Sequence, residues 1–284
     1  MMPAIQKQNN KPTVKKPVRQ MGGSVSSRIV SVGDLPDTGV KMLIYGRSKT
    51  GKTSFACSAP KKLLIISAEV GEAGGTKSVH NMKGVDYVQL QNPEEMRELV
   101  HDACLQYETV VVDTATSFES LVMAHILGIE RIPEQKSWGM ASREDYGKCG
   151  LQVKTYLREL LDLPNNTIVL AQERNFGDDK NTESDLNILP TIGAGLQPAT
   201  AGWLNCAVDY IGGTYIRRQM VEQVNKVAGK EVRTSRATGR MEYCLRVGPD
   251  PIFTTGFRRP KEFALADVIV DPTFDMLKKL ISGK

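Results

Sequence analysis

Short apolar runs separated by polar segments recur from residue 42 to residue 212. Each run is short and rich in Val, Ile and Leu, which is typical of strands buried on both faces of a sheet. The runs lie at 42–45, 62–67, 87–90, 108–113, 166–171 and 207–212. The segments between them predict helices that begin at 52 and near 93, and helices over 117–127, 142–163 and 196–206. Strands alternating with helices predict an α/β fold, with a mostly parallel sheet flanked by helices.

The pattern changes after residue 212. Strands at 214–218 and 241–247 are predicted to form a C-terminal antiparallel extension joined by a polar segment, and a last amphipathic helix follows at 271–281. We therefore predict one domain over 29–284, with a core at about 40–212 and an extension at 213–284. Residues 1–28 contain Lys, Arg, Pro and Gly but no acid, which predicts a disordered basic N-terminal arm.

Composition narrows the class of protein. The chain has 284 residues, 40% hydrophobic and 24% charged, and a net charge of +5 that permits a polyanionic partner. No apolar run approaches the ~18 residues of a membrane span and no leader is recognised, so we expect no membrane and a cytoplasmic location. The five cysteines are scattered without C-x-x-C spacing, which favours reduced thiols over a zinc site.

The segment after the first apolar run reads G-x-x-x-x-G-K-T, from Gly46 to Thr53. In this pattern the glycines let backbone N–H groups approach phosphate oxygens, and the following helix points its positive dipole end at the anion. Lys52 is expected to hold the β- and γ-phosphates, and the Thr53 hydroxyl to ligate Mg²⁺, so the predicted cofactors are ATP and Mg²⁺. The predicted nucleotide-binding residues are Gly46, Arg47, Ser48, Lys49, Thr50, Gly51, Lys52, Thr53 and Ser54.

Two carboxylates follow later apolar runs. Asp113 ends the run at 108–113, sixty residues after Thr53, which is typical of the strand that completes the Mg²⁺ site with Thr53. Glu69 comes just after the run at 62–67. Ligands gather outside the carboxyl ends of parallel strands, so Glu69 is placed to orient or deprotonate the attacking water. Glu72 is the alternative, and the residue after Asp113 is Thr114 rather than an acid.

Further polar residues are candidates for coupling the nucleotide site to other parts of the chain and to a neighbouring subunit. Gln172 follows the run at 166–171, where an amide can sense the γ-phosphate and pass its presence to the segment 173–195. That segment is net acidic and therefore a poor clamp for DNA phosphates. Arg258 and Arg259 lie on a short turn and suit insertion into a neighbour's nucleotide site, although they could equally be surface charges.

The extension has the strongest basic character of the predicted folded part. Its excess of Lys and Arg over acids predicts contact with nucleic acid, and a solvated hairpin is the alternative. The predicted DNA-binding residues are Arg217, Arg218, Lys226, Lys230, Arg233, Arg236 and Arg240.

With its P-loop helix, the acid after the next strand, a strand ending Asp113-Thr114 and a strand ending at Gln172, the chain resembles the RecA-type recombinase ATPases. It is more closely similar to short phage and prophage single-strand annealing ATPases of that superfamily, the Sak-type, AAA-like ATP-binding proteins. The resemblance covers about 40–212 and, more loosely, the tail with Arg258, Arg259 and the turn 271–273. It implies a RecA-like P-loop NTPase core, in which Glu69 activates water and Gln172 acts on the segment 173–195. The partners it implies are single-stranded DNA, further copies of the chain in a ring or filament, and a single-strand DNA binding protein.

The sequence thus predicts an ATP- and Mg²⁺-dependent, single-stranded DNA binding ATPase acting in phage recombination, annealing or repair. Three alternatives stay open: a replication motor or helicase loader, a small-molecule phosphotransferase, and a nucleotide-gated scaffold that binds no DNA. The scaffold accounts for the acidic segment 173–195, whereas the phosphotransferase requires an arginine-bearing lid on a monomer.

Overall fold

The computed structural model describes residues 29–31, 34, 38–69, 75–129, 141–176, 191–227, 230–258 and 266–282, with the side chains of 75–76 and 222–233 left out. The chain divides into two compact units, Met1–Asp37 and Thr38–Lys284. All the named helices and strands lie in the second unit. The predicted N-terminal arm at 1–28 lies outside the described residues.

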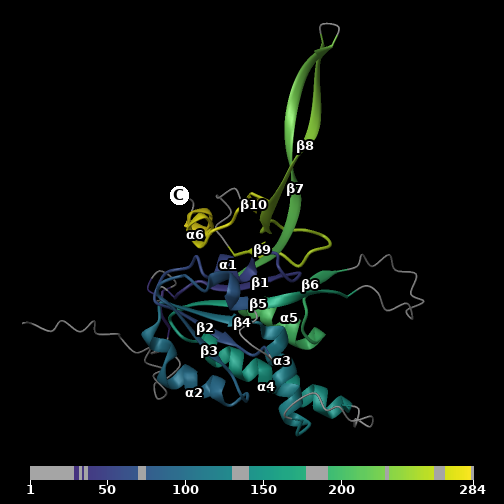
Figure 1. Cartoon of the computed structure of the whole chain (residues 1–284). Helices are drawn as coiled ribbons and strands as arrows, with labels where there is room; N and C mark the ends of the chain where they lie inside the picture. The colour runs from purple at the N-terminus through teal and green to yellow at the C-terminus, as the bar shows by residue number, and fades with distance from the viewer. Residues whose placement is uncertain are drawn as a thin grey trace, which may run out of the picture. The chain divides into compact units, whose positions relative to one another are not determined.

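The described strands form one ten-stranded sheet in the order β10-β8-β7-β1-β5-β4-β2-β3, with β6 paired to β5 and β9 paired to β7 (Figure 1). Strands β1 to β5 and the first part of β7 run parallel. They are β1 (Lys41–Gly46), β2 (Leu63–Ser67), β3 (Val85–Gln89), β4 (Thr109–Asp113), β5 (Asn166–Asn175) and β7 (Tyr210–Val227). The mostly parallel sheet predicted from the apolar runs is confirmed.

Each central strand sends alternate side chains into two separate hydrophobic clusters, because successive side chains of a strand point to opposite faces. In β1, Leu43 and Tyr45 join one cluster, whereas Met42 and Ile44 join the other. All four are almost fully buried. Burial on both faces explains why the strands read as continuous apolar runs rather than as alternating ones.

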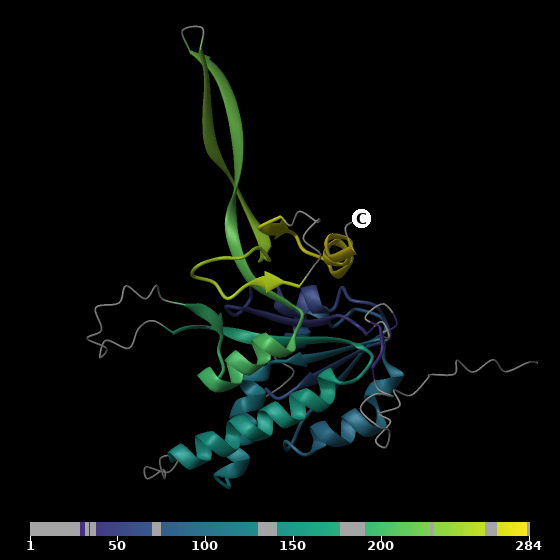
Figure 2. The same cartoon turned by 180° about the vertical axis from the view of Figure 1, so that it is seen from behind.

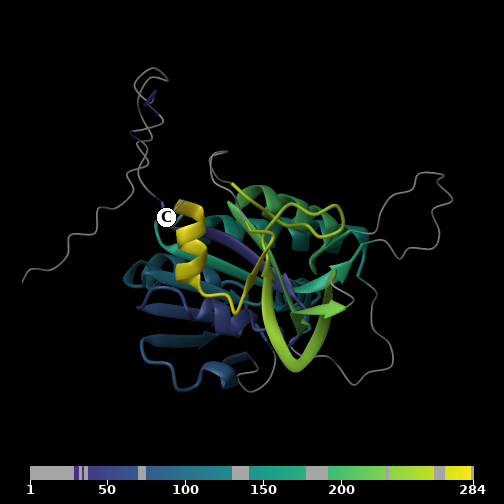
Figure 3. The same ribbon diagram turned by 90° about the horizontal axis from the view of Figure 1, so that it is seen from above.

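Helices cover both faces of the sheet. One face carries α2 (Glu95–Asp102), η4 (Cys104–Gln106), α3 (Ala115–Ile126), α4 (Arg143–Leu161) and α5 (Pro198–Ala207), as Figure 2 shows from behind. The other face carries α1 (Lys52–Ala56), η3 (Gly75–Val79) and α6 (Phe274–Ser282), and the view from above in Figure 3 shows α6 in yellow. Among the described residues, no helix is long and apolar enough to cross a bilayer.

Beyond β1, the sheet continues as an antiparallel extension. It comprises the far part of β7, β8 (Lys230–Arg246), β9 (Gly256–Phe257) and β10 (Val268–Val270), while β6 (Ile192–Ala194) pairs with the end of β5. Beyond the residues that pair with β1, β9 and β10, the described residues of β7 and β8 pair only with each other. We call residues 218–227 and 230–241 the arm. The ten residues from 218 to 227 span roughly 30 Å at about 3.3 Å per residue, and Figure 1 shows them rising away from the helices.

Two expectations for the second half of the chain need correction. The basic stretch between 218 and 241 was predicted to be a polar segment joining two short strands. Strands β7 and β8 instead continue through it as one antiparallel ladder, with a bulge between Arg218 and Met220. The segment 173–195 begins and ends as a hairpin, in which Glu173 pairs with Ala194 and Asn175 with Ile192. Residues 177–190 lie outside the described residues.

Candidate nucleotide-binding site

The phosphate-binding loop connects β1 to α1 as the glycine pattern predicts. Gly51 precedes α1 with a φ of 89°, a left-handed conformation that favours glycine. At Gly46 the space is already filled, because a Cβ there would collide with the Thr214 side chain of β7. The loop is also held from within, since Thr50 Oγ1 lies 2.8 Å from the Arg47 carbonyl and 2.7 Å from Thr214 Oγ1.

Lys52 is buried at the start of α1 and aims its ammonium group back across the loop. Its Nζ donates to the carbonyl oxygens of Gly46 at 2.8 Å and Arg47 at 2.7 Å, and lies 3.4 Å from Gln172 Oε1. Burial lowers the pKa of Lys52, while the charges of Asp113, Glu69 and Glu173 act in the opposite direction. Three carboxylates therefore act electrostatically on the cation predicted to hold phosphate.

Thr53 and Asp113, the two residues predicted to hold Mg²⁺, lie in contact with each other. Thr53 Oγ1 donates to Asp113 Oδ2 at 2.8 Å. Burial raises the pKa of Asp113, and the Thr53 hydrogen bond and Lys52 oppose that rise. Among the described residues no cluster of three or more His, Cys, Asp or Glu could hold a metal by itself. This donor set nevertheless fits Mg²⁺, which usually takes one or two protein oxygens and completes its shell with water and substrate phosphates.

Glu69 faces the same cavity from the segment that follows β2. Strand β2 pairs with β4 in a register that puts Ser67 beside Asp113, so Glu69 comes two residues past that pair. Its side chain is half-buried. Burial and the neighbouring Asp113 charge raise the pKa of Glu69, and Lys52 lowers it. The predicted convergence of both carboxylates on the loop is present, although their catalytic roles stay predictions. Glu72 lies outside the described residues.

Strand β5 lies between β1 and β4 and places its tip at the centre of the site. Gln172 pairs with Gly46 in the ladder and points its amide toward Lys52. Glu173, the next residue, accepts a hydrogen bond from Arg47 Nε at 3.3 Å. Successive residues of β5 thus contact the buried lysine and the exposed arginine of one loop. The backbone of Gln172 is fixed by Thr116 Oγ1, which accepts from its N–H at 3.0 Å.

A cavity of about 950 Å³ unites these groups. Ser48, Lys49, Thr50 and Ser54, which are predicted to bind the nucleotide, line it, whereas Arg47 borders a neighbouring cavity of about 410 Å³. The large cavity also has a wall that was not predicted as part of the site. That wall comes from β7, β8, η3 and the turn before α6, and its members are Thr214, Tyr243, Lys77, Ser78, Asp271, Pro272 and Thr273.

The predicted arginine finger is anchored elsewhere in its own chain. Arg258 pairs with Asp209 at 3.0 Å and donates to the Cys206 carbonyl at 2.7 Å. Asp209 lies beside the start of β1, since its N–H bonds to the Lys41 carbonyl, so Arg258 is at the end of the sheet opposite the loop. From this position Arg258 does not line the nucleotide cavity of its own chain. Arg259 lies outside the described residues.

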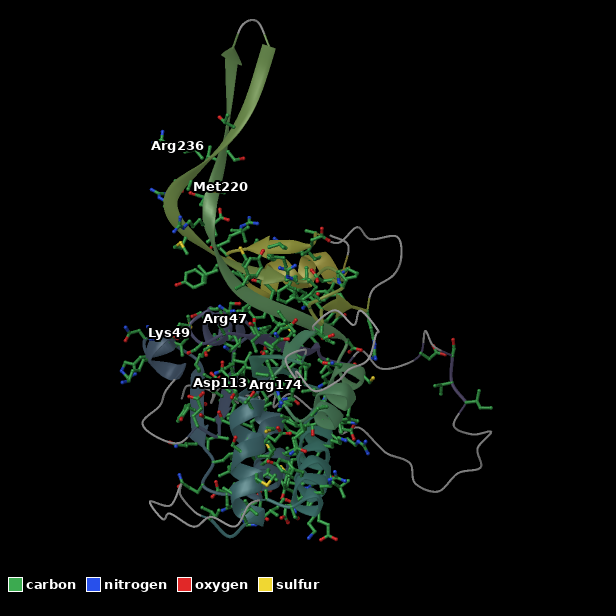
Figure 4. The ribbon with its side chains drawn as sticks, turned by 90° about the vertical axis from the view of Figure 1, so that its right-hand side faces the viewer. Arg47, Lys49, Asp113, Arg174, Met220 and Arg236 are labelled. Carbon is green, nitrogen blue, oxygen red and sulfur yellow. The ribbon has the colours of Figure 1, made fainter. Side chains whose placement is uncertain are left out.

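The predicted DNA-binding residues lie on the arm and at its base. Figure 4 shows Met220 and Arg236 on the arm, well away from Asp113 in the core. Arg218, Arg236 and Arg240 are exposed, whereas Arg217 pairs with Glu242 at 2.8 Å. The side chains of Lys226, Lys230 and Arg233 are not described. Exposed apolar side chains accompany the arginines: Met241 is opposite Arg218, and Val221 is opposite Arg236.

A parallel sheet with a phosphate-binding loop after a central strand, and with polar groups at the neighbouring strand ends, defines a P-loop NTPase fold. The chain belongs to the AAA domain family, whose model matches residues 38–240. A search of curated proteins returned no match.

Solved structures that match the chain share little sequence with it. The flagellar accessory protein FlaH from Methanocaldococcus jannaschii is 9% identical, with a TM-score of 0.38, over 82% of this chain and 85% of that one. A DnaB-like replicative helicase is 14% identical at a TM-score of 0.37, over 69% and 54%. The RadB recombinase is 13% identical at a TM-score of 0.36, over 73% and 87%.

Proposed function

We propose that the protein is an ATP- and Mg²⁺-dependent ATPase that binds single-stranded DNA and acts, as a homo-oligomer, in phage DNA recombination, annealing or repair. The observation that carries the ATPase half is the convergence of Glu69, Asp113 and Gln172 on Lys52 and Thr53 within one cavity. The exposed arginines of the arm support the DNA half. A single-strand DNA binding protein as partner and a cytoplasmic location belong to the same proposal.

The residues divide the work of hydrolysis between them. Backbone N–H groups of the loop and Lys52 bind the phosphates. Thr53 and Asp113 hold Mg²⁺, which would neutralise charge on the phosphate oxygens. Glu69 accepts a proton as water attacks the γ-phosphorus, and the bond to the bridging oxygen breaks to give ADP and phosphate. Burial raises the pKa of Glu69, which increases the proton affinity of this base, and the nearby Lys52 charge opposes that rise.

Gln172 and the arm connect hydrolysis to DNA. Gln172 lies against Lys52 on one side and leads into the β5–β6 hairpin on the other, so it is placed to report on the γ-phosphate. The arm offers Arg218, Arg236 and Arg240 to the DNA backbone, with apolar side chains next to them for the bases. Arg258, and Arg259 beside it, would act on the nucleotide of the next subunit in a ring or filament.

The test is ATP turnover of the full chain with and without single-stranded DNA, alongside particle mass in ATP. We expect single-stranded DNA to raise turnover, DNA affinity to depend on ATP and salt, and ATP to favour particles larger than a monomer. If DNA does not change ATP turnover and ATP does not change DNA affinity, the DNA half is overturned and the scaffold is favoured. Unwinding of duplex DNA would instead favour the replication motor, and monomers alone would favour the phosphotransferase.

A further inference from the structure

Two groups of residues line the nucleotide cavity, which we call its two ends, and only one group belongs to the chemistry described above. At the first end, Glu69 and Asp113 act electrostatically on Lys52, which is expected to meet the terminal phosphate, and Gln172 lies 3.4 Å from it. The other end is lined by Tyr243 of β8 and by the turn 271–273 that precedes α6. These residues come from the extension, outside the predicted core at 40–212.

The second end is tied to the loop and to α1 by specific contacts. The Tyr243 ring lies over Gly51, where an added Cβ would be 3.3 Å from Tyr243 Cδ1. Asp271 takes a left-handed conformation with a φ of 46° and donates its N–H to the Tyr243 carbonyl at 2.7 Å. Phe274 N–H donates to Ser58 Oγ at 2.8 Å, just past the end of α1. The turn is therefore held between the β8 strand and the helix of the phosphate-binding loop.

The size and chemistry of this end suit a nucleoside. The cavity volume of about 950 Å³ lies in the range of pockets that enclose a complete small molecule, and a triphosphate alone would leave much of it unfilled. Tyr243 is 46% exposed although it is aromatic, and the Pro272 ring borders the same cavity. An aromatic face stacks on any base, and Thr273 and Asp271 offer polar groups nearby.

We propose that Tyr243 and the turn 271–273 bind the base of the nucleotide, so that the arm's own strand β8 contacts the nucleotide directly. This inference rests on nucleotide binding at the proposed site but does not need DNA binding. It assigns a recognition role to the antiparallel extension. Arg240 lies only three residues from Tyr243 on β8, so the same strand carries a base contact and a residue proposed to bind DNA.

The experiment compares the affinities of ATP and of inorganic tripolyphosphate, each with Mg²⁺, for the full chain by calorimetry. Tyr243→Ala should weaken ATP roughly tenfold, as expected for loss of one stacked base, and leave tripolyphosphate unchanged. Tyr243→Phe should bind both ligands like the wild type. Tyr87→Ala, on an exposed tyrosine of β3, is the matched control and should also change neither affinity.

Unchanged ATP affinity in Tyr243→Ala would overturn the inference while leaving nucleotide binding intact. Should Tyr243→Ala lose both ligands, Tyr243→Leu keeps an apolar side chain without a ring and decides the matter. Loss of ATP alone in Tyr243→Leu supports stacking, whereas equal loss of both ligands contradicts it. A wild-type chain that binds tripolyphosphate as tightly as ATP would also overturn the inference, and one that binds neither would overturn the proposed function too.

Discussion

The two ends of strand β7 lie in opposite environments. Its first residues pair with β1 in the core, where a Cβ added to Gly212 would lie 2.8 Å from Leu245 Cδ1 and 3.0 Å from Ile44 Cδ1, so that these side chains would have to shift. Its last residues belong to the arm, where Arg218, Met220 and Val221 are exposed. Packing therefore determines each side chain of the core, whereas the arm is held by its backbone ladder.

This difference separates what substitutions should do in each region. In the core, charges such as Lys52 and Asp113 are buried and shift one another's pKa, so a change there alters both chemistry and the groups left behind. On the arm the arginines are in water, and removing one leaves no buried partner unpaired. Core variants should then lose turnover without needing DNA in the assay, and arm variants should lose DNA affinity alone.

The largest effect is expected from Lys52→Ala. Lys52 is the buried cation that meets the phosphates, and loss of such a preorganised donor lowers turnover by roughly a thousandfold. Steady-state ATP hydrolysis without DNA measures it. Lys83→Ala, which removes an exposed lysine, is the control and should hydrolyse ATP like the wild type. Hydrolysis retained by Lys52→Ala would show that the loop does not bind the phosphates in the manner proposed.

Glu69→Gln should come next. It keeps the size of the side chain but cannot accept a proton, so turnover should fall about a hundredfold while ATP still binds. Because the pKa of Glu69 is raised, its acid limb in the wild-type pH profile should lie above that of an ordinary glutamate, and it should vanish in the variant. Glu98→Gln on α2 is the exposed control, and Glu72→Gln tests the alternative base. If Glu69→Gln hydrolyses ATP at the normal rate and Glu72→Gln does so slowly, Glu72 is the catalytic base instead of Glu69.

Sequence reasoning succeeded where burial leaves a pattern. The apolar runs revealed the strands, and the glycines placed the loop between β1 and α1. The order of the strands in the sheet could not be predicted, because the residues at 166–171 do not indicate that β5 lies between β1 and β4. The wall at Tyr243 was missed for a similar reason, since it joins residues almost two hundred positions from Gly51 through β8 pairing.

The arm was misjudged for the opposite reason. Exposure on both faces removes the apolar alternation that marks a strand, so the basic stretch read as a connection although it continues both strands. The acidic segment 173–195 illustrates the limit of counting charges: Glu173 is engaged with Arg47 of the loop and is not simply a repulsive surface group. Local chemistry could be predicted, but long-range pairing could not.

On the arm, replacing Arg218, Arg236 and Arg240 together by Ala should weaken single-stranded DNA binding without changing turnover in the absence of DNA. Three lost phosphate contacts should reduce the slope of log affinity against log salt by about 2. Fluorescence anisotropy across a salt series measures both quantities. The matched control replaces Arg143, Lys148 and Lys154 of α4 by Ala, which removes the same charge from another surface. Equal losses in the two triple variants would mean that net charge, rather than the arm, attracts DNA.

The smallest effect concerns a second buried lysine, at the other end of β1. Lys41 donates to the carbonyls of Leu163 and Asn165 and to Thr167 Oγ1, and burial lowers its pKa from 10.5 to about 8. The folded state therefore disfavours the charged form that the unfolded chain retains. The cost is complete below pH 8 and is relieved as the pH rises from about 8 toward 10.5.

Wild-type stability should accordingly gain about 1 kcal/mol between pH 7 and 9 relative to Lys41→Met, which has no such group. Urea unfolding of both proteins at the two pH values measures the difference, and subtraction removes the opposing titration of the buried cysteines, whose pKa values are raised by burial. When the exposed arm residue Arg240 is replaced by Met, the change in unfolding free energy between pH 7 and 9 should equal that of the wild type. A pH-independent gap between the wild type and Lys41→Met would mean that the core tolerates this charge as readily as the arm tolerates its arginines.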